Sequence, residues 1–231
     1  MNDRITTDLK DCYFAGMRDF ELLNMYRGVP FICKAHLESV PGDAANFIVQ
    51  PPESVLLSMG KQTILLREEL GEPIRGKVVS FDIGTGQLVL GDFLFASTMV
   101  GNRSEYRVEP HPTLTIELEA SGNKIEGQLI DLSISGAGIL IPAPKLGDHF
   151  LLSISPGKPV NLHLELPDGH ANLSGTVRQS EKKESQLRLA IIFSQFAANK
   201  NLVMRYVTRL QMDIRLEVER LYKEAVANAN T

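Results

Sequence analysis

Two arginines four residues apart, Arg103 and Arg107, stand alone as cations in an acidic stretch of the sequence. No other Lys or Arg occurs between Lys77 and Lys124, whereas Asp and Glu recur there. Arginine carries five N–H donors in a rigid fork and keeps its charge at any physiological pH. That fork fits phosphate oxygens and the O6/N7 edge of guanine. The pair therefore predicts a site for a specific anion or for a base that presents acceptor atoms.

A second polar motif, residues 131–136 with the sequence DLSISG, follows about two dozen residues later. Asp131 is an acceptor for the N1–H and N2–H donors of guanine, and Ser133 offers a hydroxyl for a base or a phosphate. Residues two apart in a strand share a face, so Asp131 and Ser133 are expected to point the same way. Gly136 and Gly138 indicate either a close backbone approach or a positive φ. Together the two motifs describe a site for a guanine nucleotide with accessible phosphates.

The composition limits the classes of protein to consider. The 231 residues, 43% hydrophobic and 23% charged, suit one large or two small globular domains. A net charge of −4 gives no global field for nucleic acid, so no nucleic-acid partner is expected. Cys12 and Cys33 stand alone in their segments, which argues against a disulfide framework or a Cys-rich zinc site. Without a signal-peptide pattern or an apolar run of about 18 residues, we expect a cytoplasmic protein with no membrane span.

Residues 1–96 are expected to form an N-terminal β domain. Apolar residues at helical spacing predict a helix at 17–26, and the doublet Pro51-Pro52 precedes one or two helical turns at 53–57. A hairpin tip is expected at 84–86. The predicted strands are 31–39, 46–50, 62–67, 73–82 and 87–91.

Residues 96–104 are small and polar, and a linker is predicted at 97–107, with both arginines at its end. In the following segment, 108–196, apolar and polar residues alternate from Leu114 to Glu119, which is the pattern of a half-buried strand. Short strands at this spacing predict a six- or seven-stranded antiparallel barrel. The fold class is therefore mainly β, with two small barrel-like domains and a long C-terminal helix. The strands expected in the second barrel are 114–119, 124–130, 137–141, 149–154, 159–166, 171–179 and 185–193.

Residues 197–231 carry an apolar stripe that repeats every three or four residues, which predicts one long amphipathic helix. Such a stripe must be covered, and two partners remain open. One is the N-terminal domain, and the other is a second copy of the chain in a homodimer.

The two polar motifs resemble those of PilZ domains. Residues 102–108, NRSEYRV, match the RxxxR motif of that family, and residues 131–136 match its (D/N)xSxxG motif without departure. The resemblance covers about residues 100–200, and the upstream β domain resembles that of YcgR-like two-domain proteins. It implies that the chain binds the bacterial second messenger cyclic di-GMP. The residues it implicates in binding are Asn102, Arg103, Arg107, Asp131, Ser133, Ser135 and Gly136.

Two positions depart from the family pattern or bear on stoichiometry. Ala190 stands where the family often has Gly, at a barrel position where no effect on binding is expected. Asn102 precedes the first arginine, at a place that in the family influences whether one ligand or an intercalated pair is bound. Because Asn cannot supply another guanine-stacking cation, a single ligand is expected.

We therefore expect a receptor for cyclic di-GMP, with no other cofactor and no catalysis, whose linker closes on the ligand and moves the first domain. The resemblance implies control of motility or biofilm processes through partners such as flagellar motor components. One alternative is a ligand-independent interaction module with a degenerate PilZ barrel. A phosphodiesterase would need clustered metal ligands, which the sequence does not show. A single-strand nucleic-acid barrel would need a basic groove with exposed aromatics, but the chain is acidic and has no Trp.

Overall fold

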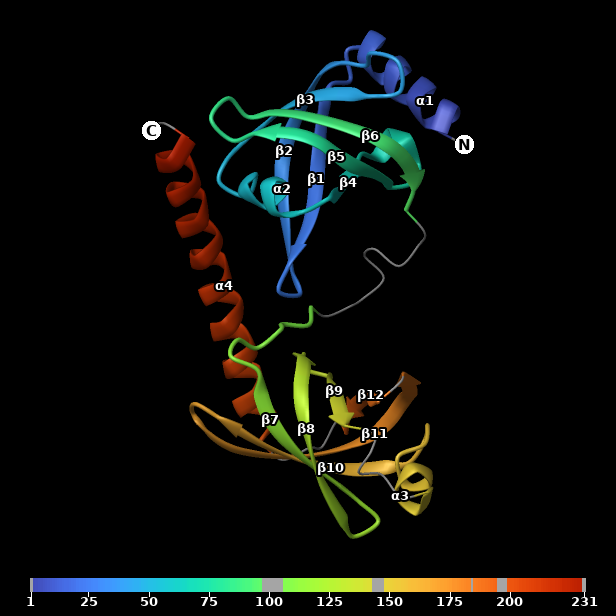
Figure 1. Cartoon of the computed structure of the whole chain (residues 1–231), viewed down its shortest axis with the longest axis vertical. Helices are drawn as coiled ribbons and strands as arrows, with labels where there is room; N and C mark the ends of the chain where they lie inside the picture. The colour runs from blue at the N-terminus through green and yellow to red at the C-terminus, as the bar shows by residue number, and fades with distance from the viewer. Residues whose placement is uncertain (1, 97–105, 143–147, 184, 195–198, 230–231) are drawn as a thin grey trace. The chain divides into compact units, whose positions relative to one another are not determined.

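The computed structural model describes residues 2–96, 106–142, 148–183, 185–194 and 199–229. The chain divides into two compact units (Figure 1). The first comprises Met1–Tyr26, Pro30–Ser104 and Ile214–Thr231, and the second comprises Arg27–Val29 and Glu105–Asp213. Each unit is built around one closed six-stranded barrel, and a long helix completes the chain. The predicted fold class, two small barrels with a long C-terminal helix, is confirmed.

The first barrel closes in the strand order β1-β2-β3-β6-β5-β4. Buried and exposed side chains alternate along its strands, and the buried set forms one core with α1 against it. The hairpin tip predicted at 84–86 joins β5 to β6, and the helical turns predicted near 53–57 are α2. The elements are α1 (Asn2–Phe14), β1 (Asp19–Tyr26), β2 (Val29–Ser39), β3 (Ala45–Val49), α2 (Val55–Met59), β4 (Gln62–Leu66), a 3-10 turn η1 (Glu68–Leu70), β5 (Ile74–Asp82) and β6 (Gln87–Phe95).

The helix predicted at 17–26 is wrong, because this segment is strand β1 and the helix lies earlier, at Asn2–Phe14. In β1 the buried positions are Phe20, Leu22 and Asn24, so a polar side chain occupies the third inward place. Because this asparagine is polar, the apolar residues of the segment do not show the two-residue period that marks a strand. In α1 the buried positions Ile5, Leu9 and Cys12 follow helical spacing, but most of the other residues are polar and Phe14 is exposed.

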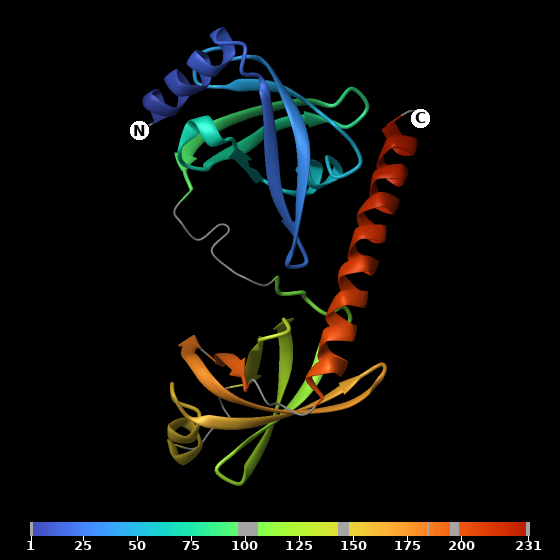
Figure 2. The ribbon, with the colours of Figure 1, turned by 180° about the vertical axis from the view of Figure 1, so that it is seen from behind.

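The second barrel closes in the order β10-β11-β12-β9-β8-β7, and every neighbouring pair is antiparallel (Figure 2). The strand predicted at 149–154 is wrong, because that segment forms the short helix α3. Six residues are too few to separate the two periods reliably. The elements are β7 (Leu114–Ala120), β8 (Asn123–Leu132), β9 (Gly136–Pro142), α3 (Asp148–Ser153), β10 (Pro159–Leu166), β11 (Gly169–Lys183) and β12 (Gln186–Phe193).

The predicted long helix is α4 (Lys200–Ala229). Its residues up to Asp213 belong to the second unit, and those from Ile214 onwards belong to the first. The apolar stripe is buried within the single chain through most of its length, including Val203 and Val207 in the second unit and Ile214 and Val218 in the first. Arg209 on α4 also donates to Asp168, in the turn between β10 and β11, at 2.8 Å. Within the described residues, no helix combines the length and apolar character needed to cross a membrane.

Candidate functional site

The DLSISG motif occupies the turn from β8 to β9. Asp131 is the next-to-last residue of β8 and pairs with Gly138 of β9, while Leu132 pairs with Ala137. The pairing register shifts between Leu129 and Asp131, which marks an irregularity just before the motif. Such irregularities bend a strand and re-aim its side chains. The motif therefore sits where the barrel wall is locally distorted.

Arg107 is brought to Asp131 by backbone pairing one residue further along the chain. The Val108 amide donates to the Leu132 carbonyl at 2.8 Å, and the Leu132 amide donates back to Val108 at 2.9 Å. With this bridge in place, the Arg107 guanidinium donates from Nη1 to Asp131 Oδ1 at 3.1 Å. The Arg107 side chain is 30% exposed and the Asp131 side chain only 13%. The second arginine of one motif and the acid of the other thus form a partly buried ion pair.

Gly138 leaves the space in which the Asp131 carboxylate lies. A Cβ placed on Gly138 would lie 2.7 Å from the Asp131 carboxyl carbon, which is closer than side-chain contacts allow. Gly138 is not among the glycines with positive φ. Of the two roles the sequence left open for this glycine, close approach is therefore the one observed, and the approaching group is the acid of the motif.

Gly136 also allows a close approach, but the group that approaches it belongs to the barrel rather than to a ligand. A Cβ there would overlap the Ile191 carbonyl oxygen of β12, the strand that pairs with β9. The neighbouring Ser135 carbonyl accepts from the Phe193 amide at 2.8 Å. Both contacts fasten the β8–β9 turn to β12.

The two serines of the motif differ in their surroundings. Ser133 is 1% exposed, and its hydroxyl accepts from the Gly136 amide at 3.1 Å. The same hydroxyl lies 3.3 Å from the Gly136 carbonyl and 3.4 Å from the Ser135 hydroxyl. Ser135 itself is exposed. Ser133 therefore holds the turn, and Ser135 is the hydroxyl that faces outwards.

A cation that the sequence reasoning missed lies on the other side of the carboxylate. Arg188 of β12 places Nη2 3.6 Å from Asp131 Oδ2, with its side chain 60% exposed. In the sequence, Arg188 is one of many scattered arginines. It lies in a predicted strand with alternating apolar and polar residues, and no local pattern singles it out. Only the barrel's strand order brings it to the motif. Asn102 and Arg103, the other two predicted site residues, lie outside the described residues.

A comparison with known protein families covers the residues of both motifs. The model described as the PilZ domain matches residues 101–209 of the chain. These residues form a PilZ domain. The match includes both motifs, the whole second barrel and the beginning of α4. No curated protein matches the chain.

Several solved structures resemble the chain along most of its length. The MrkH–c-di-GMP complex of K. pneumonia has 14% identity and a TM-score of 0.45, covering 95% of this chain and 96% of that one. YcgR from Escherichia coli in complex with c-di-GMP has 14% identity and a TM-score of 0.44, covering 96% and 95%. The Bacillus subtilis inhibitor of motility MotI/DgrA has 13% identity and a TM-score of 0.41, covering 85% and 96%.

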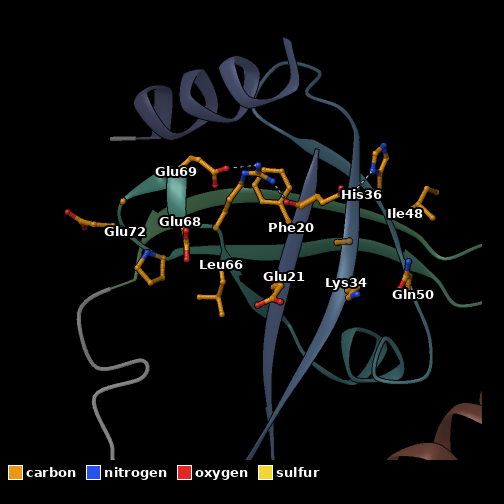
Figure 3. A pocket seen from close by; sticks show the side chains of 15 residues that line it. Phe20, Glu21, Lys34, His36, Ile48, Gln50, Leu66, Glu68, Glu69 and Glu72 are labelled. Carbon is orange, nitrogen blue, oxygen red and sulfur yellow. Dashed lines mark hydrogen bonds and ion pairs between the residues drawn. The ribbon is translucent and has the colours of Figure 1, made fainter. Parts of the chain in front are cut away.

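A groove of about 950 Å³ lies outside the PilZ domain, on the outer face of the first barrel (Figure 3). Arg67 is fixed in its wall, 5.3 Å from the Phe20 ring and 2.9 Å from Glu69. The lining carries more carboxylates than cations, so this groove disfavours an anionic nucleotide. None of the motif residues lines it. The carboxylates are Asp19, Glu21, Glu68, Glu69 and Glu72, and the cations are Lys34 and Arg67, with His36 bonded to Asp19.

The described part of the PilZ domain offers charged donors and acceptors rather than a metal centre. No group of three His, Cys, Asp or Glu side chains within the described ranges is arranged to hold a metal ion. The arginine–carboxylate cluster can present donors to phosphate or base acceptors, and it can accept from base N–H groups.

Proposed function

We propose that the chain is a receptor for cyclic di-GMP that binds the ligand at its PilZ domain and catalyses no reaction. The observation that carries the proposal is the ion pair between Arg107 and Asp131, since it joins the RxxxR and DxSxxG motifs at one point on the barrel. Cyclic di-GMP combines guanine edges with phosphates, the two targets that arginine recognises best.

In the proposed complex, the Asp131 carboxylate accepts the N1–H and N2–H donors of one guanine. Arg107 turns from Asp131 to the ligand, and Arg103 engages it from the linker. Ser135 and the backbone at Gly136 complete the surface on the barrel side. Exchange of the Arg107–Asp131 pair for ligand contacts makes binding selective, because only a ligand with both donors and acceptors replaces what the two groups lose.

The output proposed for binding is a change in the arrangement of the two units. Arg103 belongs to the linker segment, so contacts from it to the ligand would restrict the chain between the barrels at a cost in conformational entropy. The charge-assisted contacts must exceed that cost. A partner protein, such as a component of motility or biofilm machinery, would read the rearranged surface, and no nucleic-acid partner is proposed.

Titration calorimetry of the full chain tests the binding site. The parent is expected to bind cyclic di-GMP, while Arg103→Ala and Arg107→Ala lose at least tenfold in affinity. Arg205→Ala, which removes an exposed arginine of α4, serves as the control for net charge. Equal affinity in all four proteins would contradict the site. If the parent does not bind, the chain is better described as a ligand-independent interaction module.

Small-angle scattering with and without ligand tests the coupling. A change in radius of gyration on adding cyclic di-GMP to the parent, absent in Arg103→Ala, is the expected result. An unchanged radius at saturating ligand would contradict the rearrangement while leaving the binding site intact.

The stoichiometry from the calorimetric titration is expected to be one ligand per chain.

A further inference from the structure

Asp131 has a cation on each of its two carboxylate oxygens. Arg107 holds Oδ1 at 3.1 Å, and Arg188 lies 3.6 Å from Oδ2. The two arginines come from unrelated parts of the sequence, one from the segment before β7 and one from β12. Neither the RxxxR nor the DxSxxG motif includes Arg188.

The contact between Asp131 and Arg188 reaches across an intervening strand. Asp131 on β8 pairs with Gly138 on β9, and Gly138 pairs with Ala190 on β12. Arg188 lies two residues before Ala190, so it shares a face with it. Backbones of strands two apart are separated by about 10 Å, which two side chains can span only over small residues. Gly138, the β9 residue between them, has no side chain, so the space above β9 is open at this point, and Ala190 beside it on β12 adds only a methyl.

The burial of Asp131 explains why a second cation is needed. A carboxylate that is 13% exposed loses much of its hydration, and removing the sole partner of such a charge is strongly unfavourable. In the proposed complex Arg107 turns to the ligand and leaves Oδ1 to the guanine donors. A cation that stays at Oδ2 keeps the carboxylate paired and oriented while this exchange takes place.

We propose that Arg188 is a positioning residue for ligand binding, which keeps the Asp131 carboxylate paired when Arg107 moves to cyclic di-GMP. This inference rests on the proposed function. The Arg188 side chain is 60% exposed, so it is free to adjust as the ligand arrives. The alternative role for a cation at this place is competition, in which Arg188 occupies an acceptor that the ligand needs. The two roles predict opposite effects of removing it.

Calorimetry with cyclic di-GMP on the full chain separates the two roles. Arg188→Gln is expected to bind about tenfold more weakly than the parent, and Arg188→Lys should recover most of the loss because it restores the charge. Arg205→Gln, the same change on α4, should bind like the parent. An unchanged or tighter Kd in Arg188→Gln would overturn the inference. The affinity loss should also vanish in an Asp131→Asn background, and an equal loss there would overturn it as well.

A second measurement needs no ligand. Urea unfolding of Arg107→Gln, Arg188→Gln and the double variant reports whether both arginines support one carboxylate. The midpoint of the double variant is expected to fall by more than the sum of the single shifts, because only then is the buried charge left without a cation. Additive shifts would contradict the shared pairing. If the parent binds no cyclic di-GMP, the proposed function and this role fail together, and additive shifts with normal parent binding refute this inference alone.

Discussion

The Asp131 carboxylate lies where a side chain at position 138 would be, and the glycine there leaves that space free. Asp131 on β8 and Gly138 on β9 are paired in the PilZ barrel, and both arginines described above contact the carboxylate at this position. A glycine two residues beyond the DxSxxG motif thus decides where the acid of that motif points.

Gly138→Ala is expected to displace the Asp131 carboxylate and to destabilise the second unit by about 1–3 kcal/mol, the usual cost of overpacking. Ligand affinity should fall with it, because the acid loses its orientation. Urea unfolding and calorimetry measure the two effects. In the double variant Gly138→Ala/Asp131→Ala the clash is removed, so the stability cost of the alanine at 138 should shrink. The same cost in both backgrounds would show that the carboxylate is not the obstacle.

Ser133→Ala and Ser135→Ala form a matched pair in one turn. Ser133→Ala leaves the Gly136 amide without its side-chain acceptor in a buried place, so a loss of about 1–3 kcal/mol in unfolding free energy is expected. Ser135→Ala should change stability by less than about 0.5 kcal/mol, as for an exposed substitution. Chemical denaturation checks both. If the two losses are equal, the turn does not depend on the Ser133 hydroxyl.

The first half of α4 is expected to stabilise the PilZ barrel through buried side chains. Val203 is fully buried and its neighbour Met204 is 43% exposed. Val203→Ala should lower the unfolding free energy of the second unit by about 1–3 kcal/mol, and Met204→Ala by less than about 0.5 kcal/mol. Thermal unfolding followed by calorimetry resolves the difference. A larger effect at Met204 would mean that the exposed side of α4 is covered in solution.

Cys33 is expected to be chemically inert in the folded chain. Burial raises the pKa of its thiol from the ordinary value of 9.0 to about 12, and the charge of Glu53 adds to the shift. Because the folded state holds this proton more tightly, stability is fully present below pH 9 and declines as the pH rises towards 12. Cys33→Ala should remove that part of the decline.

Thiol labelling at pH 8 gives a direct check on Cys33. Labelling should be slow in native protein and fast in denaturant, since the thiolate is the reactive form. Rapid labelling of Cys33 under native conditions would contradict the burial. Cys12, whose thiol pKa is also raised by burial, is distinguished by repeating the measurement on Cys33→Ala.

The sequence predicted both barrels because most of their strands alternate cleanly, as Leu114–Ala120 does. It failed where a polar residue faces inwards, as Asn24 does in β1, and where the segment is too short for its period to show, as in α3. The motif residues were predictable because spacing and chemistry mark them. Arg188 was not singled out, and Gly138 was marked for a close approach or a positive φ without its partner being known, since both roles depend on which strands become neighbours, and strand order is a long-range property.

The division of α4 between the two units makes the chain less modular than its two barrels suggest. Neither unit is one contiguous stretch of sequence: the second joins Arg27–Val29 to Glu105–Asp213, and the first takes the later half of α4 from beyond the second. A gene fragment that encodes the strands of either barrel alone would leave apolar residues of that barrel uncovered. Recombination between related genes would therefore preserve this architecture only if the helix were inherited together with both barrels.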